Sequence, residues 1–145
     1  MLRELTLDEL LTAVGERTPA PASGAATALT AALAAALAEL SARYAGNEAD
    51  AERAHAVAAE LVELGDADAA AYGAFMAERN EHTRAEIVRV PEEIARLADE
   101  AVELALRATD ELSPSVAGDA RASAALGRAA ATVARELARL NRAES

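Results

Sequence analysis

Hydrophobic residues recur along most of the chain with the period of an α-helix, and no useful length of it shows the alternation of a strand. The pattern predicts an all-α fold, a single-domain bundle of about five helices covering residues 1–145. The most apolar stretch, Ala25 to Leu40, is mainly alanine, leucine and threonine, and Arg43 and Glu48 follow it closely. We therefore expect a buried central helix there and no membrane span.

Local signals predict where these helices begin and end. Thr6 and Glu9 have the spacing of a capping box, which predicts a first helix from Leu7 to Glu16. Pro91 suits the first turn of the fourth helix, where its missing N–H is not needed. The polar stretch Asn80 to Arg84 is then expected to be a mobile connection. The remaining helices are expected at about 23–44, 49–79, 91–112 and 116–141.

Composition narrows the classes of function. Hydrophobic residues make up 52% of the chain but aromatic ones only 2%, which predicts alanine-rich helices that approach closely. A net charge of −11 argues against binding to nucleic acid, which requires a basic surface. The absence of cysteine excludes thiol catalysis and cysteine-bound metals. The first residues enter an amphipathic helix without an apolar signal region, so a cytoplasmic location is expected.

Two carboxylates in the third helix are the first candidates for chemistry. Asp66 and Asp68 lie about 200° apart on a helix and cannot form one catalytic pair. Asp66 needs no functional explanation, because acidic residues cost little on the solvated face of a helix. Asp68 falls on the apolar side, and Tyr72 shares its face one turn later. A carboxylate on a packed face is costly unless it is paired or functional, which makes Asp68 the candidate catalytic residue.

Metal-binding patterns occur in the chain, but each is incomplete. Glu52 and His55 have the spacing found in di-iron bundles, but the pattern occurs once where two copies are needed. The pairs Glu60–Glu63 and Glu100–Glu103 faintly resemble the carboxylates of all-α nucleotide pyrophosphohydrolases, yet the second pair lacks the expected aspartate. Acidic pairs are common on solvated helix faces in so acidic a chain. No metal site is predicted.

The stretch from Pro19 to Leu29 is unusual for a helix start. Pro19 and Pro21 hold the chain extended, and the small residues Ser23 and Gly24 then open the second helix. Such a helix N-terminus presents backbone N–H groups that can meet a carbonyl, a carboxylate or a phosphate.

Taken together, these stretches resemble the cyclodeaminase/cyclohydrolase family. This is the folate domain of formimidoyltransferase-cyclodeaminase and of free-standing bacterial methenyltetrahydrofolate cyclohydrolases. The order of elements is similar from about Leu5 to Asn141. The resemblance rests on four stretches, of which the second is the most specific: Pro19 to Leu29, Asp66 to Tyr72, Val90 to Ala95, and Gly118-Asp119.

The resemblance implies an all-helical homodimer that binds a tetrahydrofolate derivative and needs no other cofactor. The activity implied is that of a formimidoyltetrahydrofolate cyclodeaminase or a methenyltetrahydrofolate cyclohydrolase, both of which pass through a cationic amidinium. Asp68 matches the position regarded as catalytic in the cyclodeaminases. The substrate-binding residues implied or favoured are Pro21, Ser23, Gly24, Tyr72 and Asp119.

Several positions depart from the family pattern. Ala22 and Ser23 stand where the family has two glycines, and Ala25 where it has a serine. Thr132 and Glu136 replace two asparagines of the last helix. The connection between Met76 and Pro91 is also shorter than usual, which removes part of the pocket wall. The alternative is therefore a diverged member that binds another small ligand or is catalytically inactive.

Overall fold

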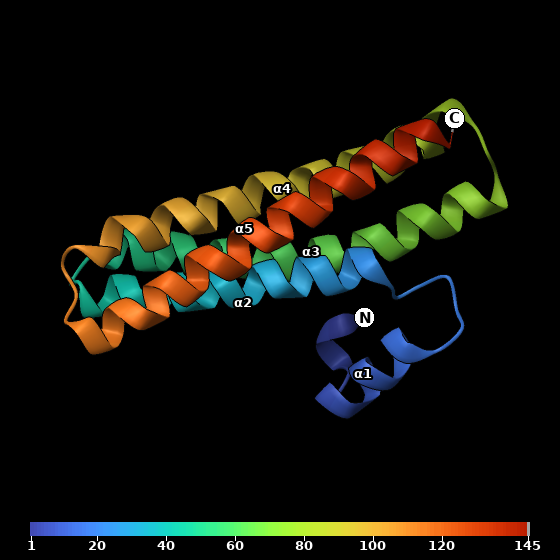
Figure 1. Cartoon of the computed structure of the whole chain (residues 1–145). Helices are drawn as coiled ribbons and strands as arrows, with labels where there is room; N and C mark the ends of the chain where they lie inside the picture. Colours follow the sequence, from blue (N-terminus) through green and yellow to red (C-terminus); the bar gives the residue numbers. More distant parts are fainter. Residues whose placement is uncertain (145) are drawn as a thin grey trace.

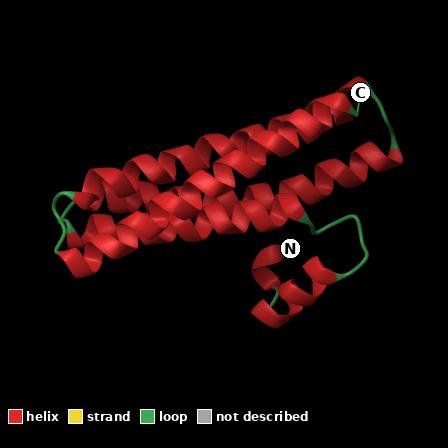
Figure 2. Cartoon of the chain, in the orientation of Figure 1, coloured by secondary structure: helices red, strands yellow, loops and turns green. Residues whose placement is uncertain are grey.

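A computed structural model describes residues 1–144 of the chain. The described residues contain helices and no strand (Figure 2), which confirms the all-α prediction. In chain order the elements are a short 3-10 helix η1 (Leu2–Glu4), α1 (Leu7–Gly15), α2 (Ser23–Tyr44), α3 (Glu48–Ala77), α4 (Glu81–Thr109) and α5 (Pro114–Ala143).

The four long helices α2 to α5 form a bundle, and α1 stands beside it (Figure 1). Helix α1 buries none of its residues, and Leu7 and Leu11 are 69% and 63% exposed. The chain before α1 is docked on α3, because the backbone N–H of Leu2 donates to Oδ1 of Asp66 at 2.9 Å. The Leu2 side chain also packs over Gly65, where a Cβ would have to displace it.

The core of the bundle is built from small residues, as the composition predicts. Helix α2 contacts α3, α4 and α5, and its buried positions are mostly alanine. Gly127 of α5 lies against α4 and α2, where a Cβ would come within 3.3 Å of the Ala98 carbonyl. Ser123 of α5 donates to the carbonyl of Ala34 at 2.6 Å. These close approaches hold α5 against α2 without large side chains.

Helix α2 is the one described helix long and apolar enough to cross a membrane, with a mean hydropathy of 1.5 over its most apolar window. Of that window, 56% is buried within the bundle. This burial agrees with the predicted core helix.

Helix α4 begins at Glu81, ten residues before the predicted start at Pro91. Asn80 and Thr83 cap it reciprocally: the Thr83 N–H donates to Oδ1 of Asn80 at 2.9 Å, and the Asn80 N–H donates to the Thr83 hydroxyl at 3.1 Å. This cap was not among the predicted helix starts. The stretch from Asn80 to Arg84 is therefore the start of a helix, and the connection is confined to residues 78–80.

Pro91 accordingly lies inside α4, where it is buried. A proline gives no N–H to the carbonyl four residues earlier, which here belongs to Ile87. That carbonyl accepts a hydrogen bond from Nδ2 of Asn141 on α5, at 2.6 Å. A side chain of the last helix thus supplies the donor that the backbone of α4 lacks.

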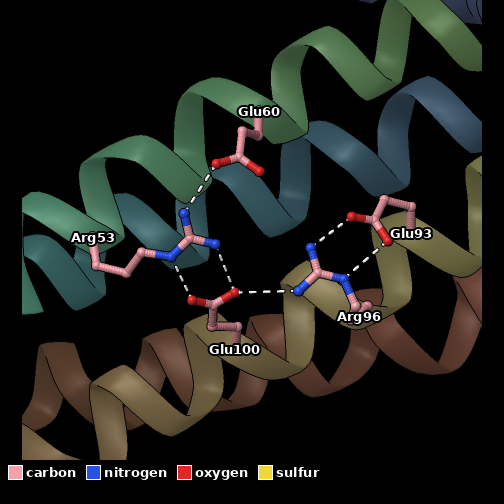
Figure 3. A network of polar contacts seen from close by, with 5 residues as sticks. All are labelled: Arg53, Glu60, Glu93, Arg96 and Glu100. Carbon is pink, nitrogen blue, oxygen red and sulfur yellow. Dashed lines mark hydrogen bonds and ion pairs between the residues drawn. The ribbon is translucent and has the colours of Figure 1, made fainter.

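A network of ion pairs joins α3 to α4 (Figure 3). Arg53 donates to Glu100 across the helix pair at 2.5 and 2.9 Å and to Glu60 at 3.0 Å. Arg96 lies 3.5 Å from Glu100 and also binds Glu93. The bonds to Glu100 are the largest cause that raises the pKa of Arg53 above its ordinary value. Glu60 and Glu100, one from each of the two acidic pairs, are thus engaged by arginine.

Candidate active site

A cavity of about 220 Å³ lies at the end of the bundle where α2 begins and α5 ends. We call this the open end. Three separate parts of the chain meet there: the segment that enters α2, the later turns of α3, and the adjoining ends of α4 and α5. The lining residues are Pro19, Ala20, Ala22, Ser23, Gly24, Asp68, Tyr72, Ile87, Leu137 and Asn141.

Asp68 is the only ionisable carboxyl group in this lining. Among residues 1–144 no group forms a hydrogen bond or ion pair with its carboxylate. Burial disfavours the charged form and raises the pKa of Asp68 above its ordinary value. A half-buried carboxylate without a partner is costly for folding, and carboxylates of this kind are concentrated at functional sites.

Gly24 allows this carboxylate to sit against the first turn of α2. A Cβ at Gly24 would lie 2.6 Å from Oδ1 of Asp68 and closer still to Cγ and Oδ2. Helix α2 also starts without a side-chain cap, because its N-cap residue is Ala22. The first backbone N–H groups of a helix have no partner within it, so this turn offers polar groups beside Asp68.

Most of the other predicted residues gather at the same cavity. Tyr72 lines it from one turn beyond Asp68, and Ser23 lines it from the start of α2. Pro21 is not in the lining, although its neighbours Ala20 and Ala22 are, and the Ala20–Pro21 peptide bond is cis. The structure therefore brings together Asp68, Ser23, Gly24 and Tyr72, while Pro21 lies between two lining residues without lining the cavity itself. Their roles toward a substrate stay predictions.

Asp119 does not reach this cavity within one chain. It lies near the start of α5, whereas Asn141 lines the cavity near the end of that helix. The rise of a helix separates the two by about 33 Å. The geometry of a single chain gives no support to Asp119 as a substrate-binding residue.

Three lining residues lie outside the stretches singled out from the sequence: Ile87, Leu137 and Asn141. Leu137 and Asn141 are spaced by one helical turn and share a face, so a signal is present in the sequence. It becomes interpretable only because the last turn of α5 meets the first turns of α2 and α4. A helix that starts at Pro91 would not include Ile87, so the sequence prediction did not show that the Ile87 carbonyl lacks its helical donor.

A second hollow, of about 400 Å³, lies at the opposite end of the bundle. We call this the closed end, because the Asp50 and Arg107 side chains in its lining are paired with each other. Arg107 donates to both carboxylate oxygens of Asp50 at 3.0 and 3.1 Å, and Asn47 caps α3 by accepting from the Asp50 N–H. Among residues 1–144 no group of three or more His, Asp or Glu side chains is placed to hold a metal ion.

Comparisons with known proteins identify a family and a similar structure. Residues 6–144 match the family model described as formiminotransferase-cyclodeaminase. The structure is similar to the crystal structure of formiminotetrahydrofolate cyclodeaminase from Thermotoga maritima, with a TM-score of 0.87 and 25% sequence identity. The match covers 99% of this chain and 81% of that one. A search of curated proteins found no match.

Proposed function

Because the chain belongs to the formiminotransferase-cyclodeaminase family, as its motifs predicted, we propose that it acts on a one-carbon derivative of tetrahydrofolate. The reaction proposed is the cyclisation of formiminotetrahydrofolate to methenyltetrahydrofolate with release of ammonia. The observation that carries the proposal is the unpaired Asp68 carboxylate held in the open-end cavity against Gly24.

The reaction needs a group that can move a proton from one nitrogen to another. N10 of the folate attacks the carbon of the formimino group, which is protonated and therefore an amidinium cation. A tetrahedral intermediate forms in which N10 carries an extra proton and the former imino nitrogen is an NH₂ group. That proton moves to the former imino nitrogen, the bond from carbon to this nitrogen breaks, and ammonia leaves. The product is the cationic methenyl bridge between N5 and N10. One group that accepts a proton and returns it to the leaving nitrogen can serve both steps.

Asp68 suits this role for two reasons. Burial raises its pKa toward the range in which a carboxyl group both accepts and returns protons. Its negative charge also lies in a partly dehydrated cavity, where it stabilises an amidinium cation more strongly than it would in water. Gly24 leaves room for the carboxylate, and the adjacent backbone and the Tyr72 and Ser23 side chains supply polar contacts to the bound molecule.

The volume of the cavity limits what it can hold. Sites for whole drug-sized ligands occupy roughly 300–1,000 Å³, and this one measures about 220 Å³. We infer that the cavity takes the reacting ring system and the one-carbon unit. The remainder of the folate then lies outside it.

The proposal is tested by following ammonia release and the formation of methenyltetrahydrofolate from formiminotetrahydrofolate. We expect both products in equal amounts. Binding of 5-formyltetrahydrofolate, measured by calorimetry, provides a readout that is independent of turnover. Hydrolysis of methenyltetrahydrofolate without ammonia release would transfer the assignment to a cyclohydrolase. Neither binding nor turnover of these folates would favour the diverged relative with another ligand.

We also propose that the protein is a homodimer formed through α2 and α5. These helices pack against each other, and each leaves large apolar side chains exposed. On α2, Leu33 and Tyr44 are each 65% exposed, and on α5 Leu126 and Val133 are 39% and 43% exposed. Leu33 and Tyr44 are eleven residues apart and fall on one face of α2, as Leu126 and Val133, seven apart, do on α5, so each helix offers an apolar face to a second copy.

Light scattering at micromolar concentration tests the dimer. We expect twice the chain mass of 14.9 kDa for the parent and a single-chain mass for Leu33→Asp, which places a charge on the exposed face of α2. A single-chain mass for the parent would contradict the proposal.

A further inference from the structure

The carbonyl of Ile87 is the starting point, because it is free of its usual helical partner and lies beside the cavity. In an α-helix this carbonyl would accept from the N–H of the residue four positions later, which is Pro91 and has none. Asn141 donates to it instead at 2.6 Å. Ile87 and Asn141 both line the cavity that contains Asp68.

This hydrogen bond fixes which way the Asn141 amide points. A carbonyl oxygen can only accept, so the group facing the Ile87 carbonyl must be the NH₂ end of the Asn141 side chain. Its other end, Oδ1, receives no hydrogen bond from any group within residues 1–144. Oδ1 of Asn141 therefore remains available as an acceptor, and the hydrogen bond from Nδ2 to the Ile87 carbonyl sets the direction in which it points.

We propose that Asn141 is a positioning residue whose Oδ1 accepts an N–H of the bound heterocycle and holds it against Asp68, and that Pro91 orients Asn141 by leaving the Ile87 carbonyl free. The inference rests on the proposed function and goes beyond it by naming a contact. A reduced pteridine carries N–H donors on its amino and lactam groups, which match such an acceptor. The three residues belong to α4 and α5, so the contact is built on helices and not on a loop.

A purely structural role is the competing explanation, since Asn141 also satisfies a carbonyl that Pro91 leaves unpaired. The two explanations predict different measurements. If Asn141 only ties α5 to α4, its loss lowers the melting temperature and leaves substrate affinity unchanged. If it positions the ligand, its loss raises KM and the Kd of a ligand analogue.

The first variant is Asn141→Leu, which keeps a similar volume and removes both the donor and the acceptor. We expect the KM for formiminotetrahydrofolate and the Kd for 5-formyltetrahydrofolate to rise about 10-fold or more, the factor typical of one lost hydrogen bond in a desolvated site. The change in kcat should be smaller than the change in KM. Arg139→Leu is the matched control: it alters a polar residue of the same turn that binds Glu136 on the surface, and it should leave KM unchanged.

The second variant is Pro91→Ala, which keeps Asn141 but gives α4 an N–H for the Ile87 carbonyl. Removing a proline from a helix interior favours the helix, so this variant should fold. We expect KM to rise because the new N–H at position 91 competes with the Asn141 amide for the Ile87 carbonyl and weakens the bond that orients the amide. In the double variant, which combines Pro91→Ala with Asn141→Leu, KM should rise no further than in Asn141→Leu alone, because both changes act through one contact.

An active parent with unchanged KM and Kd in Asn141→Leu would overturn the inference, whatever the change in melting temperature. If Asn141→Leu does not fold, an unchanged KM in Pro91→Ala overturns it. Both results leave the proposed function standing. A parent that neither binds nor turns over these folates removes the proposed function, and this inference falls with it.

Discussion

The two ends of the bundle differ in whether the carboxylate that α3 places there has a partner. At the closed end Asp50 of α3 is held by Arg107 through two hydrogen bonds, and Asn47 caps the helix. At the open end Asp68 of the same helix has no partner among residues 1–144, and α2 begins without a side-chain cap. The closed-end hollow is the larger of the two, yet its Asp50 and Arg107 side chains already bind each other.

Whether a carboxylate is paired distinguishes a structural site from a functional one more clearly than the volume of the cavity does. A paired carboxylate contributes to stability and leaves little capacity for a ligand. An unpaired, half-buried carboxylate costs stability and is retained where chemistry requires it. The comparison predicts that changes at the open end alter the reaction, whereas changes at the closed end alter only stability.

The largest effect is expected for Asp68→Asn. Asparagine keeps the shape of the side chain but can neither shuttle a proton nor balance a cation, so kcat should fall by about 10²–10⁴-fold. The melting temperature should hold or rise, because a buried charge is removed. Steady-state ammonia release and thermal unfolding measure the two quantities. Full activity in the variant would show that the open-end carboxylate is not catalytic.

Asp66→Asn is the matched control for that variant, two residues away on the same helix. Asp66 accepts a hydrogen bond from the Leu2 N–H, and asparagine retains an oxygen that can accept it. We expect kcat and KM within about twofold of the parent, since the carboxylate points away from the cavity. A loss equal to that of Asp68→Asn would mean that the two positions act through the fold and not through chemistry.

The next effect concerns the space beside Asp68. In Gly24→Ala the new methyl group would overlap the Asp68 carboxylate, which must move. We expect kcat/KM to fall about 10-fold or more, because a displacement of about 1 Å at a reacting group has effects of this order. Gly73→Ala is the control on α3: a methyl group there meets nothing within 4 Å. It should keep the activity and gain up to about 1 kcal/mol of stability.

The pH dependence of stability gives a smaller, specific signal. Burial raises the pKa of Asp68, so the folded protein keeps the Asp68 proton at pH values where the unfolded chain has lost it. Stability therefore falls as the pH rises from about 4 through the folded-state pKa. Asparagine does not ionise, so the melting temperature of Asp68→Asn relative to the parent should increase from acidic to neutral pH. A constant difference would argue that Asp68 is not desolvated.

The smallest effect is expected at the closed end. Asp50→Asn weakens the ion pair with Arg107, whose side chain is 58% exposed, so the loss in unfolding free energy should be at most about 1 kcal/mol. Chemical denaturation measures this loss, and turnover should not change. Reduced turnover in Asp50→Asn at unchanged stability would break the comparison between the two ends.

Much of the fold is readable from local sequence signals. The capping box of Thr6 and Glu9 predicts the start of α1, and both of its hydrogen bonds form. The motifs shared with the family predict that Asp68, Tyr72 and Gly24 belong to one site, and all three line the open-end cavity. The start of α4 was predicted wrongly: Pro91 suits a first turn, but the helix is capped by Asn80, eleven residues earlier.

The remainder depended on three-dimensional contacts that no local pattern contains. Asn141 is 54 residues from Ile87 along the chain. It reaches the cavity only because the last turn of α5 meets the first turns of α4. Asp119 matched a family motif in sequence, yet the length of α5 places it at the closed end. Helical periodicity predicts which residues share a face, but not which helix ends meet.

A crystal structure of the protein with 5-formyltetrahydrofolate tests most directly whether the open end is the active site. We expect the ring system to lie in the open-end cavity, with its one-carbon unit beside Asp68 and Gly24 and the rest of the folate outside. Density for the ligand in the closed-end hollow beside Asp50 and Arg107, or an empty open end at saturating ligand, would contradict this assignment.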